Sequence, residues 1–147
     1  MQKVKFRGFK LFHDNHESVE SMVRQIDEFP SFFTPSGDQP LIVDCGANIG
    51  ISVLEWKTRW PQSRVICFEP DPFAFAILQK NIDENDIPGV KCVNAAVSDC
   101  DDTATLYGDI SACGDARGNS IDAAWGERDG SAQATVACTR LSSYIAD

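Results

Sequence analysis

The chain has 147 residues, of which 43% are hydrophobic, and this is enough for one globular domain with its own core. Its 13 Lys and Arg residues are outnumbered by 22 Asp and Glu residues, which gives a formal charge of −9. Proteins that bind nucleic acid usually carry an excess of positive charge. We therefore expect no nucleic-acid partner and instead a small or polar organic ligand.

Residues 1–14, MQKVKFRGFKLFHD, mix charges with apolar residues, so they match neither a signal peptide nor a membrane span. We expect a soluble, cytoplasmic protein. The six cysteines form no C-x-x-C motif and accompany no histidine cluster, which argues against a metal site or a redox motif. We expect them to act as small apolar residues of strands: Cys45, Cys67, Cys92, Cys100, Cys113 and Cys138.

Residues 1–39 are predicted to form an N-terminal extension with a strand, a helix and a linker. Apolar residues alternate with basic ones over residues 4–11 and change register at Gly8, which predicts a short hairpin or a bulged strand. Residues 29–40 contain three prolines and a glycine and are predicted to be a connection. The helix between them is indicated by apolar residues at helical spacing: Val19, Met22, Val23 and Ile26.

Residues 40–147 are predicted to form the main domain, which begins with alternating strands and helices. Short apolar runs, typical of strands buried on both faces, alternate with segments of helical period. Connections this short favour right-handed crossovers, so we predict a doubly wound, mostly parallel α/β sheet. Asp71 is expected to cap the second helix, with Pro72 at its first position. The predicted strands are 40–45, 64–69 and 90–97, and the predicted helices are 49–60 and 71–85.

The sequence changes character after Asp99. Residues 98–133 are acidic, rich in glycine and weakly patterned, with one candidate strand at 103–108. Strand-like sequence returns at 134–141. We interpret the region as an excursion or hairpin, and we expect a mobile surface loop rather than a substrate lid.

Two glycines mark the turn after the first strand of the main domain. Gly46 and Gly50 stand at the carboxyl end of this strand, where a doubly wound sheet binds its ligand. The amides that open the following helix are expected to point outward, free to donate to a polar ligand group. The order D-C-G-A-N-I-G is not the G-x-G-x-x-G of dinucleotide binders, and Asp44 would repel a pyrophosphate. An acid here suits a cationic ligand such as S-adenosylmethionine.

An acidic residue also ends the second strand. Glu69 follows Gly50 by 19 residues, and a carboxylate at this point can accept hydrogen bonds from both ribose hydroxyls of an adenosine ligand. Dinucleotide and S-adenosylmethionine binders both use such an acid. The combination of Asp44, the glycine spacing and Glu69 favours S-adenosylmethionine.

The motifs VDCGANIG, VICFEPDPFAFAILQKNIDEN and VKCVNAAVSD together resemble the FkbM-type methyltransferases. The resemblance covers about residues 40–107 and, more weakly, 134–145. It implies an S-adenosylmethionine-dependent methyltransferase of class I, with the Rossmann-like fold, which methylates a hydroxyl of a small molecule, a sugar or a lipid-linked glycan. It also implies the cofactor-binding residues: Asp44, Gly46, Ala47, Asn48 and Gly50 at the methionine end, Glu69 at the ribose, and Pro70, Ala96 and Val97 near the adenine.

The resemblance stops before a fourth strand, which in this family reads like K-I-D-V-E-G. Residues 136–147 look like the segment that precedes that strand. We therefore expect a truncated chain or an amino-terminal fragment with an incomplete C-terminal half. The missing strand would lie beside the first strand, and the bare edge could take up a partner chain or promote self-association.

Other readings of the same residues remain open. Asp44 could only cap a helix, the glycines could only permit tight packing, and Glu69 could be a solvated acid. The alternative functions are a non-catalytic or inactive nucleotide-binding module and an NAD-dependent oxidoreductase. No general base can be assigned, because His13 and His16 are expected to be surface or helix-start residues. Four aromatic residues at helical spacing are expected in the core: Trp56, Trp60, Phe73 and Phe75.

Overall fold

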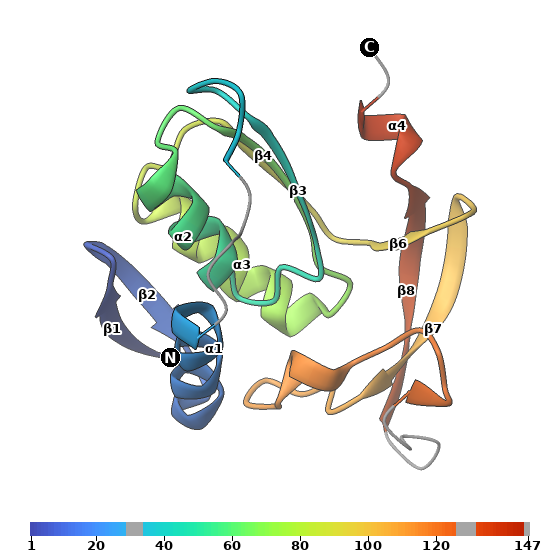
Figure 1. The fold of residues 1–147 in the computed structure, drawn as a ribbon. Helices are drawn as coiled ribbons and strands as arrows, with labels where there is room; N and C mark the ends of the chain where they lie inside the picture. The colour runs from blue at the N-terminus through green and yellow to red at the C-terminus, as the bar shows by residue number, and fades with distance from the viewer. Residues whose placement is uncertain (29–33, 126–131, 146–147) are drawn as a thin grey trace.

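We describe the fold from a computed structural model of the chain, shown in Figure 1. It describes residues 1–28, 34–125 and 132–145. The parts of the predicted connection and excursion that fall on residues 29–33 and 126–131 lie outside the described residues, as do 146–147. No helix in the described ranges is long and apolar enough to cross a membrane.

The chain begins with a hairpin, and not with the bulged strand that was the other predicted possibility. Strands β1 (Gln2–Phe6) and β2 (Phe9–His13) pair antiparallel, with Phe6 opposite Phe9. The two residues between them, Arg7 and Gly8, both have positive φ, at 49° and 95°. This is the backbone of the tight hairpin turns whose twist matches that of the strands. Helix α1 follows at His16–Glu28.

Three parallel strands form the central sheet, in the order β3, β4, β5. Figure 1 shows α2 and α3 together on one face of this sheet, as two successive right-handed crossovers require. The apolar side chains between sheet and helices include Val53, Val65 and Leu78, which are at most 1% exposed. The predicted Rossmann-like α/β arrangement is thus confirmed. Its elements are β3 (Leu41–Cys45), α2 (Ile51–Arg59), β4 (Arg64–Phe68), α3 (Pro72–Asp83) and β5 (Val90–Val93).

The prediction of one continuous third strand at 90–97 was wrong. The chain leaves the central sheet after β5, and β6 (Ala96–Ser98) pairs instead with β8 (Ala132–Arg140) of a second sheet. Asn94 lies at the break, where its side-chain amide donates to the carbonyl oxygen of Glu69 at 2.8 Å. This contact competes with continued strand pairing and turns the chain.

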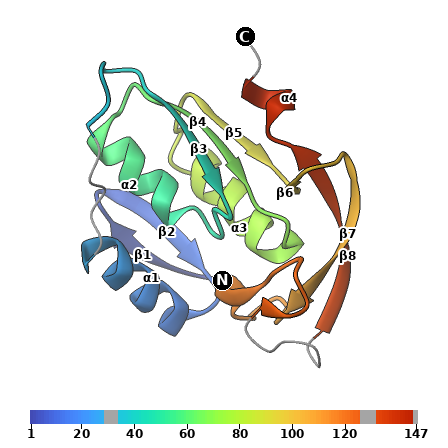
Figure 2. The ribbon, with the colours of Figure 1, turned by 45° about the vertical axis from the view of Figure 1, so that its right-hand side comes forward.

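The second sheet has the order β6, β8, β7, with β7 (Asp102–Gly108) antiparallel to β8. The predicted strands at 103–108 and 134–141 are confirmed. Figure 2 shows this sheet beside the carboxyl ends of the central strands. The short helix α4 (Ser142–Ile145) then returns to the central sheet. There the ring of Tyr144 contacts that of Phe68 edge-on, with 5.0 Å between the ring centroids.

The hairpin and α1 share one hydrophobic core with α2 and α3. This cluster contains buried side chains from all four parts of the chain: Phe6, Leu11, Val19, Ile49, Ile51, Leu54, Ala74 and Ile77. Two asparagines of α3 and the turn after it also bond the free edge of β2. Asn81 exchanges hydrogen bonds with the backbone N–H and C=O of Phe12, and Asn85 does so with Lys10. The edge of β2 is thereby covered.

Burial distinguishes the two asparagines, and this predicts different effects of replacing them. Asn81 is fully buried and also donates to the carbonyl oxygen of Ile49 at 2.8 Å. Asn81→Leu is expected to lower the free energy of unfolding by about 2 kcal/mol, because buried backbone groups lose their partners. Asn85→Leu, the matched control, is expected to cost less than about 1 kcal/mol, because water can replace the lost bonds. Urea unfolding measures both, and equal effects would contradict this explanation.

Several side chains differ from their predicted environments. Trp56, Trp60 and Phe75 pack against the core as expected, but Phe73 is 43% exposed. Phe73 lies in the first turn of α3, whose N-terminal end projects beyond the sheet. All six cysteines are free thiols, and three of them are exposed: Cys45 at the end of β3, and Cys100 and Cys113 outside the strands.

Candidate cofactor-binding site

The turn between β3 and α2 has an unusual backbone. Gly46, Asn48 and Gly50 all have positive φ, at 92°, 50° and 91°. The chain is held close to β4 there, because the amides of Gly46 and Ala47 both donate to the carbonyl oxygen of Phe68, at 2.8 and 2.9 Å. The glycines therefore permit a backbone path that other residues rarely adopt.

The amides of the turn that precedes α2 are engaged within the protein. The predicted helix began at residue 49, whereas α2 begins at Ile51, after Gly50, whose position at the N-cap supplies no side-chain hydrogen bond. The amide of Asn48 donates to Oε2 of Glu69 at 2.7 Å, and the amide of Ile49 donates to the side chain of Asn48 at 2.8 Å. The amide of Gly50 donates to the carbonyl oxygen of Ala47. A pyrophosphate would find these donors already engaged.

Glu69 links the two turns that follow β3 and β4. Its Oε2 accepts from Asn48, and its Oε1 accepts from the amide of Asp71 at 2.8 Å. The residue is only 5% exposed, which contradicts the alternative of a solvated acid. Burial raises the pKa of Glu69 to about 7, against the two amide bonds that lower it, while Asp71 and Asp44 add smaller upward contributions.

Two cavities lie at the carboxyl ends of the central strands and share Gly46, Pro70 and Asn119. The first, of about 250 Å³, we call the polar cavity, and it is lined by Met22, Gln25, Gly46, Asn48, Glu69, Pro70, Ala116, Arg117 and Asn119. The second, of about 220 Å³, we call the apolar cavity, and it is lined by Cys45, Gly46, Phe68, Pro70, Ala95, Ala96, Val97, Leu106, Asn119, Ser120 and Ile121.

Six of the nine residues predicted from the sequence line these cavities: Gly46, Asn48, Glu69, Pro70, Ala96 and Val97. The other three lie behind them. Asp44 accepts a 2.5 Å hydrogen bond from the Ser52 hydroxyl, and burial raises its pKa. Ala47 is buried in the core. A Cβ on Gly50 would lie 2.7 Å from Cδ1 of Leu78, so close packing and the positive φ explain that glycine without a ligand.

Gly46 differs from Gly50 in what surrounds it. A Cβ built on Gly46 would meet no heavy atom within 4 Å. The missing side chain therefore leaves open space where the two cavities meet. This is the geometry expected of a glycine that lets a ligand approach the backbone.

Asp71 caps α3, as predicted. Its Oδ1 accepts from the amides of Phe73 and Ala74, at 2.8 and 3.2 Å, with Pro72 at the first helical position. Its Oδ2 accepts from the side-chain amide of Asn119 at 2.8 Å. The N-cap of α3 thus also anchors the loop between β7 and β8.

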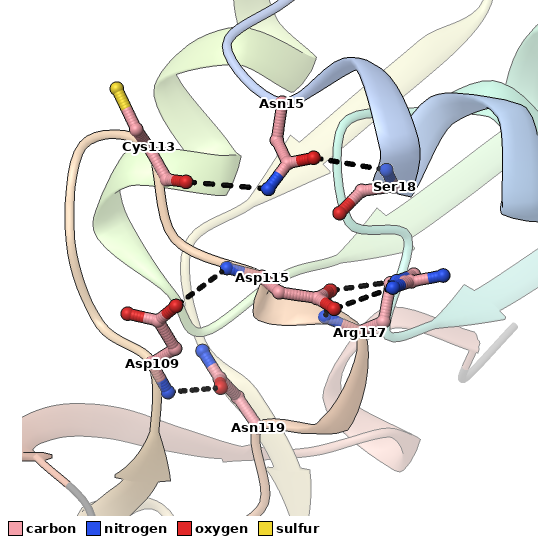
Figure 3. Close-up of polar contacts among 7 residues, drawn as sticks. All are labelled: Asn15, Ser18, Asp109, Cys113, Asp115, Arg117 and Asn119. Atoms are coloured by element: carbon pink, nitrogen blue, oxygen red, sulfur yellow. Dashed lines mark hydrogen bonds and ion pairs between the residues drawn. The ribbon is translucent and has the colours of Figure 1, made fainter.

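This loop was not recognised from the sequence as part of the site. Residues 109–121 fold back between α1 and α3 instead of forming a free surface loop, and they supply lining residues to both cavities. Figure 3 shows how Asn15, at the start of α1, donates to the carbonyl oxygen of Cys113 at 3.4 Å. Within the loop, Asp109 accepts from the amide of Asp115, and its own amide donates to Asn119. No local periodicity signals these contacts.

The two histidines do not line either cavity. His16 lies exposed at the start of α1, as predicted, but His13 was wrongly expected at the surface and is only 1% exposed. Neither ring nitrogen of His13 has a hydrogen-bond partner within the described ranges, and burial lowers its pKa. The described residues contain no group of three or more His, Cys, Asp or Glu side chains that could hold a metal ion.

Parallel strands with two adjoining cavities at their carboxyl ends define a Rossmann-like fold, and folds of this kind bind their ligands at this edge of the sheet. Residues 44–147 match the family described as the methyltransferase FkbM domain. The chain therefore belongs to the FkbM methyltransferase family.

Individual relatives agree with this membership. Methyltransferase sdnD of Sordaria araneosa is 40% identical over 68 residues, which are 46% of this chain and 26% of that protein. Methyltransferase 1 of Beauveria bassiana (strain ARSEF 2860) is 40% identical over 57 residues, or 39% of this chain and 23% of that protein. The chain thus matches about a quarter of the length of these curated relatives.

Among solved structures, a methyltransferase FkbM from Methylobacillus flagellatus KT aligns with a TM-score of 0.49 and 19% sequence identity. The alignment covers 81% of this chain and 26% of that chain.

Proposed function

We propose that the chain is the cofactor-binding part of an S-adenosylmethionine-dependent methyltransferase. The observation that carries the proposal is the position of Glu69, a buried carboxylate that lines the polar cavity beside the apolar one. Family membership supports it. The proposal includes the division into an N-terminal extension, residues 1–39, and the methyltransferase domain, residues 40–147.

The two cavities match the two chemical halves of this cofactor. The apolar cavity offers Phe68, Leu106 and Ile121 to a planar base, and the polar cavity offers Glu69 to the ribose hydroxyls. When bound, S-adenosylmethionine would supply a methyl group attached to a sulfonium. The charges of Glu69 and of Asp44 behind it favour a cation in this cleft.

The same geometry disfavours a dinucleotide. The amides of Asn48, Ile49 and Gly50, in the turn before α2, already donate within the protein, so this turn offers few free donors to a pyrophosphate. This is the basis for ranking NAD below S-adenosylmethionine.

The wider proposal concerns acceptor, partners and location. We propose that the acceptor is a hydroxyl of a small molecule, a sugar or a lipid-linked glycan, because the resemblance to this family suggests one. Six free thiols suit a reducing compartment, which supports a cytoplasmic location. β3 pairs only with β4 within the described ranges, so we propose that its other edge takes up a partner strand. Gel filtration over a range of concentrations tests for self-association.

Calorimetric titration of the 147-residue chain with S-adenosylhomocysteine, with NAD as the control, tests the proposed function. We expect S-adenosylhomocysteine to bind with micromolar affinity and NAD to give no saturable heat. A chain that circular dichroism shows to be folded, but that binds neither ligand, would favour the inactive module. Preferential binding of NAD would favour the oxidoreductase.

A further inference from the structure

Arg117 supplies a positive charge at the edge of an acidic site. It lies in the short 3-10 turn Ala116–Gly118 of the loop between β7 and β8, and it lines the polar cavity with Asn48 and Glu69. Among the described residues that line either cavity, Arg117 is the only lysine or arginine. The charge of this side chain therefore distinguishes one end of the cleft from the rest.

The guanidinium is held in place but not saturated. Its Nε donates to Oδ1 of Asp115 at 2.7 Å, and its Nη2 donates to Oδ2 at 2.5 Å, as Figure 3 shows. Arginine has five N–H donors, so the two groups on Nη1 and one on Nη2 remain for another acceptor. The side chain of Arg117 is 35% accessible to solvent. A planar guanidinium fixed along one edge presents its other edge in a defined direction.

The loop that carries Arg117 is fixed at both ends of the turn. Asn119 bonds Asp71 at the N-cap of α3, and Cys113 bonds Asn15 at the start of α1. The amide of Arg117 itself donates to Asp115 at 3.2 Å. These contacts hold the guanidinium beside the cavity before any ligand arrives, which lowers the entropic cost of binding.

We propose that Arg117 binds the carboxylate of the amino-acid part of S-adenosylmethionine. This inference rests on the proposed function. The cofactor carries a carboxylate as well as its two cationic groups, and that carboxylate would be repelled by Glu69 and Asp44 without a nearby cation. Arg117 meets this requirement, and its free N–H groups suit a carboxylate acceptor.

The test compares two ligands that differ in the amino-acid part, which carries this carboxylate together with an ammonium group. S-adenosylhomocysteine carries the amino-acid part, whereas 5′-methylthioadenosine has the same nucleoside and sulfur without it. Calorimetry measures both dissociation constants for the unchanged chain and for Arg117→Gln. We expect Arg117→Gln to raise the dissociation constant of S-adenosylhomocysteine at least tenfold and that of 5′-methylthioadenosine less than about twofold, because only the former loses a charge-assisted bond.

Two further variants complete the experiment. Arg64→Gln removes the same charge at the start of β4, at the opposite end of the strand from Glu69, and is expected to leave both affinities unchanged. Arg117→Lys keeps the charge, and its affinity for S-adenosylhomocysteine is expected to lie between those of Arg117→Gln and the unchanged chain. If Arg117→Gln weakened the binding of both ligands equally, or changed neither dissociation constant, the assignment would be overturned. If the unchanged chain bound neither ligand, that result would instead refute the proposed function.

Discussion

Gly50→Ala is expected to lower the free energy of unfolding by about 2–5 kcal/mol. Two costs combine at this position. The backbone has φ of 91°, which a residue with a Cβ adopts only with strain of roughly 1–2 kcal/mol. The new methyl would also lie 2.7 Å from Cδ1 of Leu78, a fully buried side chain that cannot move aside without displacing its neighbours. Overpacking of this kind typically costs about 1–3 kcal/mol.

Two other glycines provide matched controls. Gly46 has nearly the same φ, 92°, but no heavy atom would lie within 4 Å of its Cβ, so Gly46→Ala is expected to cost only the strain. Gly37 lacks both the positive φ and the close neighbour, and Gly37→Ala is expected to change the free energy of unfolding by less than about 0.5 kcal/mol.

Gly50→Ala is expected to have the larger effect on stability, but Gly46→Ala is expected to have the larger effect on ligand binding. A methyl group on Gly46 would enter the space where the polar and apolar cavities meet. We expect Gly46→Ala to weaken S-adenosylhomocysteine binding at least tenfold, although the chain stays folded. Urea unfolding and calorimetry of the three variants measure both effects. If Gly46→Ala bound the ligand normally, the cavities would not be the cofactor site.

Local patterns in the sequence account for most of what was predicted correctly. The apolar runs of β3 and β4, the period of α2 and α3, and the cap of Asp71 each depend on residues close together in the chain. The carboxyl ends of parallel strands then bring Gly46 and Glu69 to one edge, although 23 positions separate them. Topology alone predicts this meeting.

Contacts between distant segments account for what was missed. The third strand breaks because Asn94 bonds the backbone of Glu69, which no pattern within 90–97 reveals. The loop of residues 109–121 joins the site through Asn119 and Asp71, which are 48 positions apart. His13 is buried because α1 and α3 cover β2, and its polar character predicted the opposite. In each case tertiary contacts overrode the local signal.

Binding of S-adenosylhomocysteine is expected to weaken about tenfold between pH 8 and pH 6. The pKa of Glu69 in the folded chain is about 7, because burial disfavours its charged form. The ionised carboxylate accepts hydrogen bonds from ribose hydroxyls better than the protonated one does, so the ligand prefers ionised Glu69. If only that form binds, about one chain in ten is competent at pH 6 and nearly all are at pH 8.

The sign of the stability change follows from the same pKa. The folded value lies above the ordinary 4.5, so the folded chain without ligand binds the proton more tightly than the unfolded chain does. Its free energy of unfolding should therefore fall as the pH rises from about 4.5 to 7, by up to about 3 kcal/mol from this group. The ligand should recover part of this loss, because it stabilises the ionised carboxylate.

Variants of Glu69 separate this residue from other titrating groups. Glu69→Ala should lower cofactor affinity at least tenfold, since charge-assisted hydrogen bonds contribute roughly 1.5–3 kcal/mol each. Glu69→Gln cannot ionise, so its affinity should be weak and nearly independent of pH between 6 and 8. Glu84→Gln, at an exposed residue beyond the end of α3, should retain the pH dependence of the unchanged chain.

Calorimetry in two buffers of different ionisation enthalpy supplies an independent measure. Binding near pH 6.5 should release a proton from the unchanged chain and from Glu84→Gln but not from Glu69→Gln. Proton release that persists in Glu69→Gln would assign the titration to another group. An unchanged dissociation constant in Glu69→Ala would show that this carboxylate does not bind the ribose. The buried position of Glu69 would then serve only its two amide bonds, which join the turn after β3 to the start of α3.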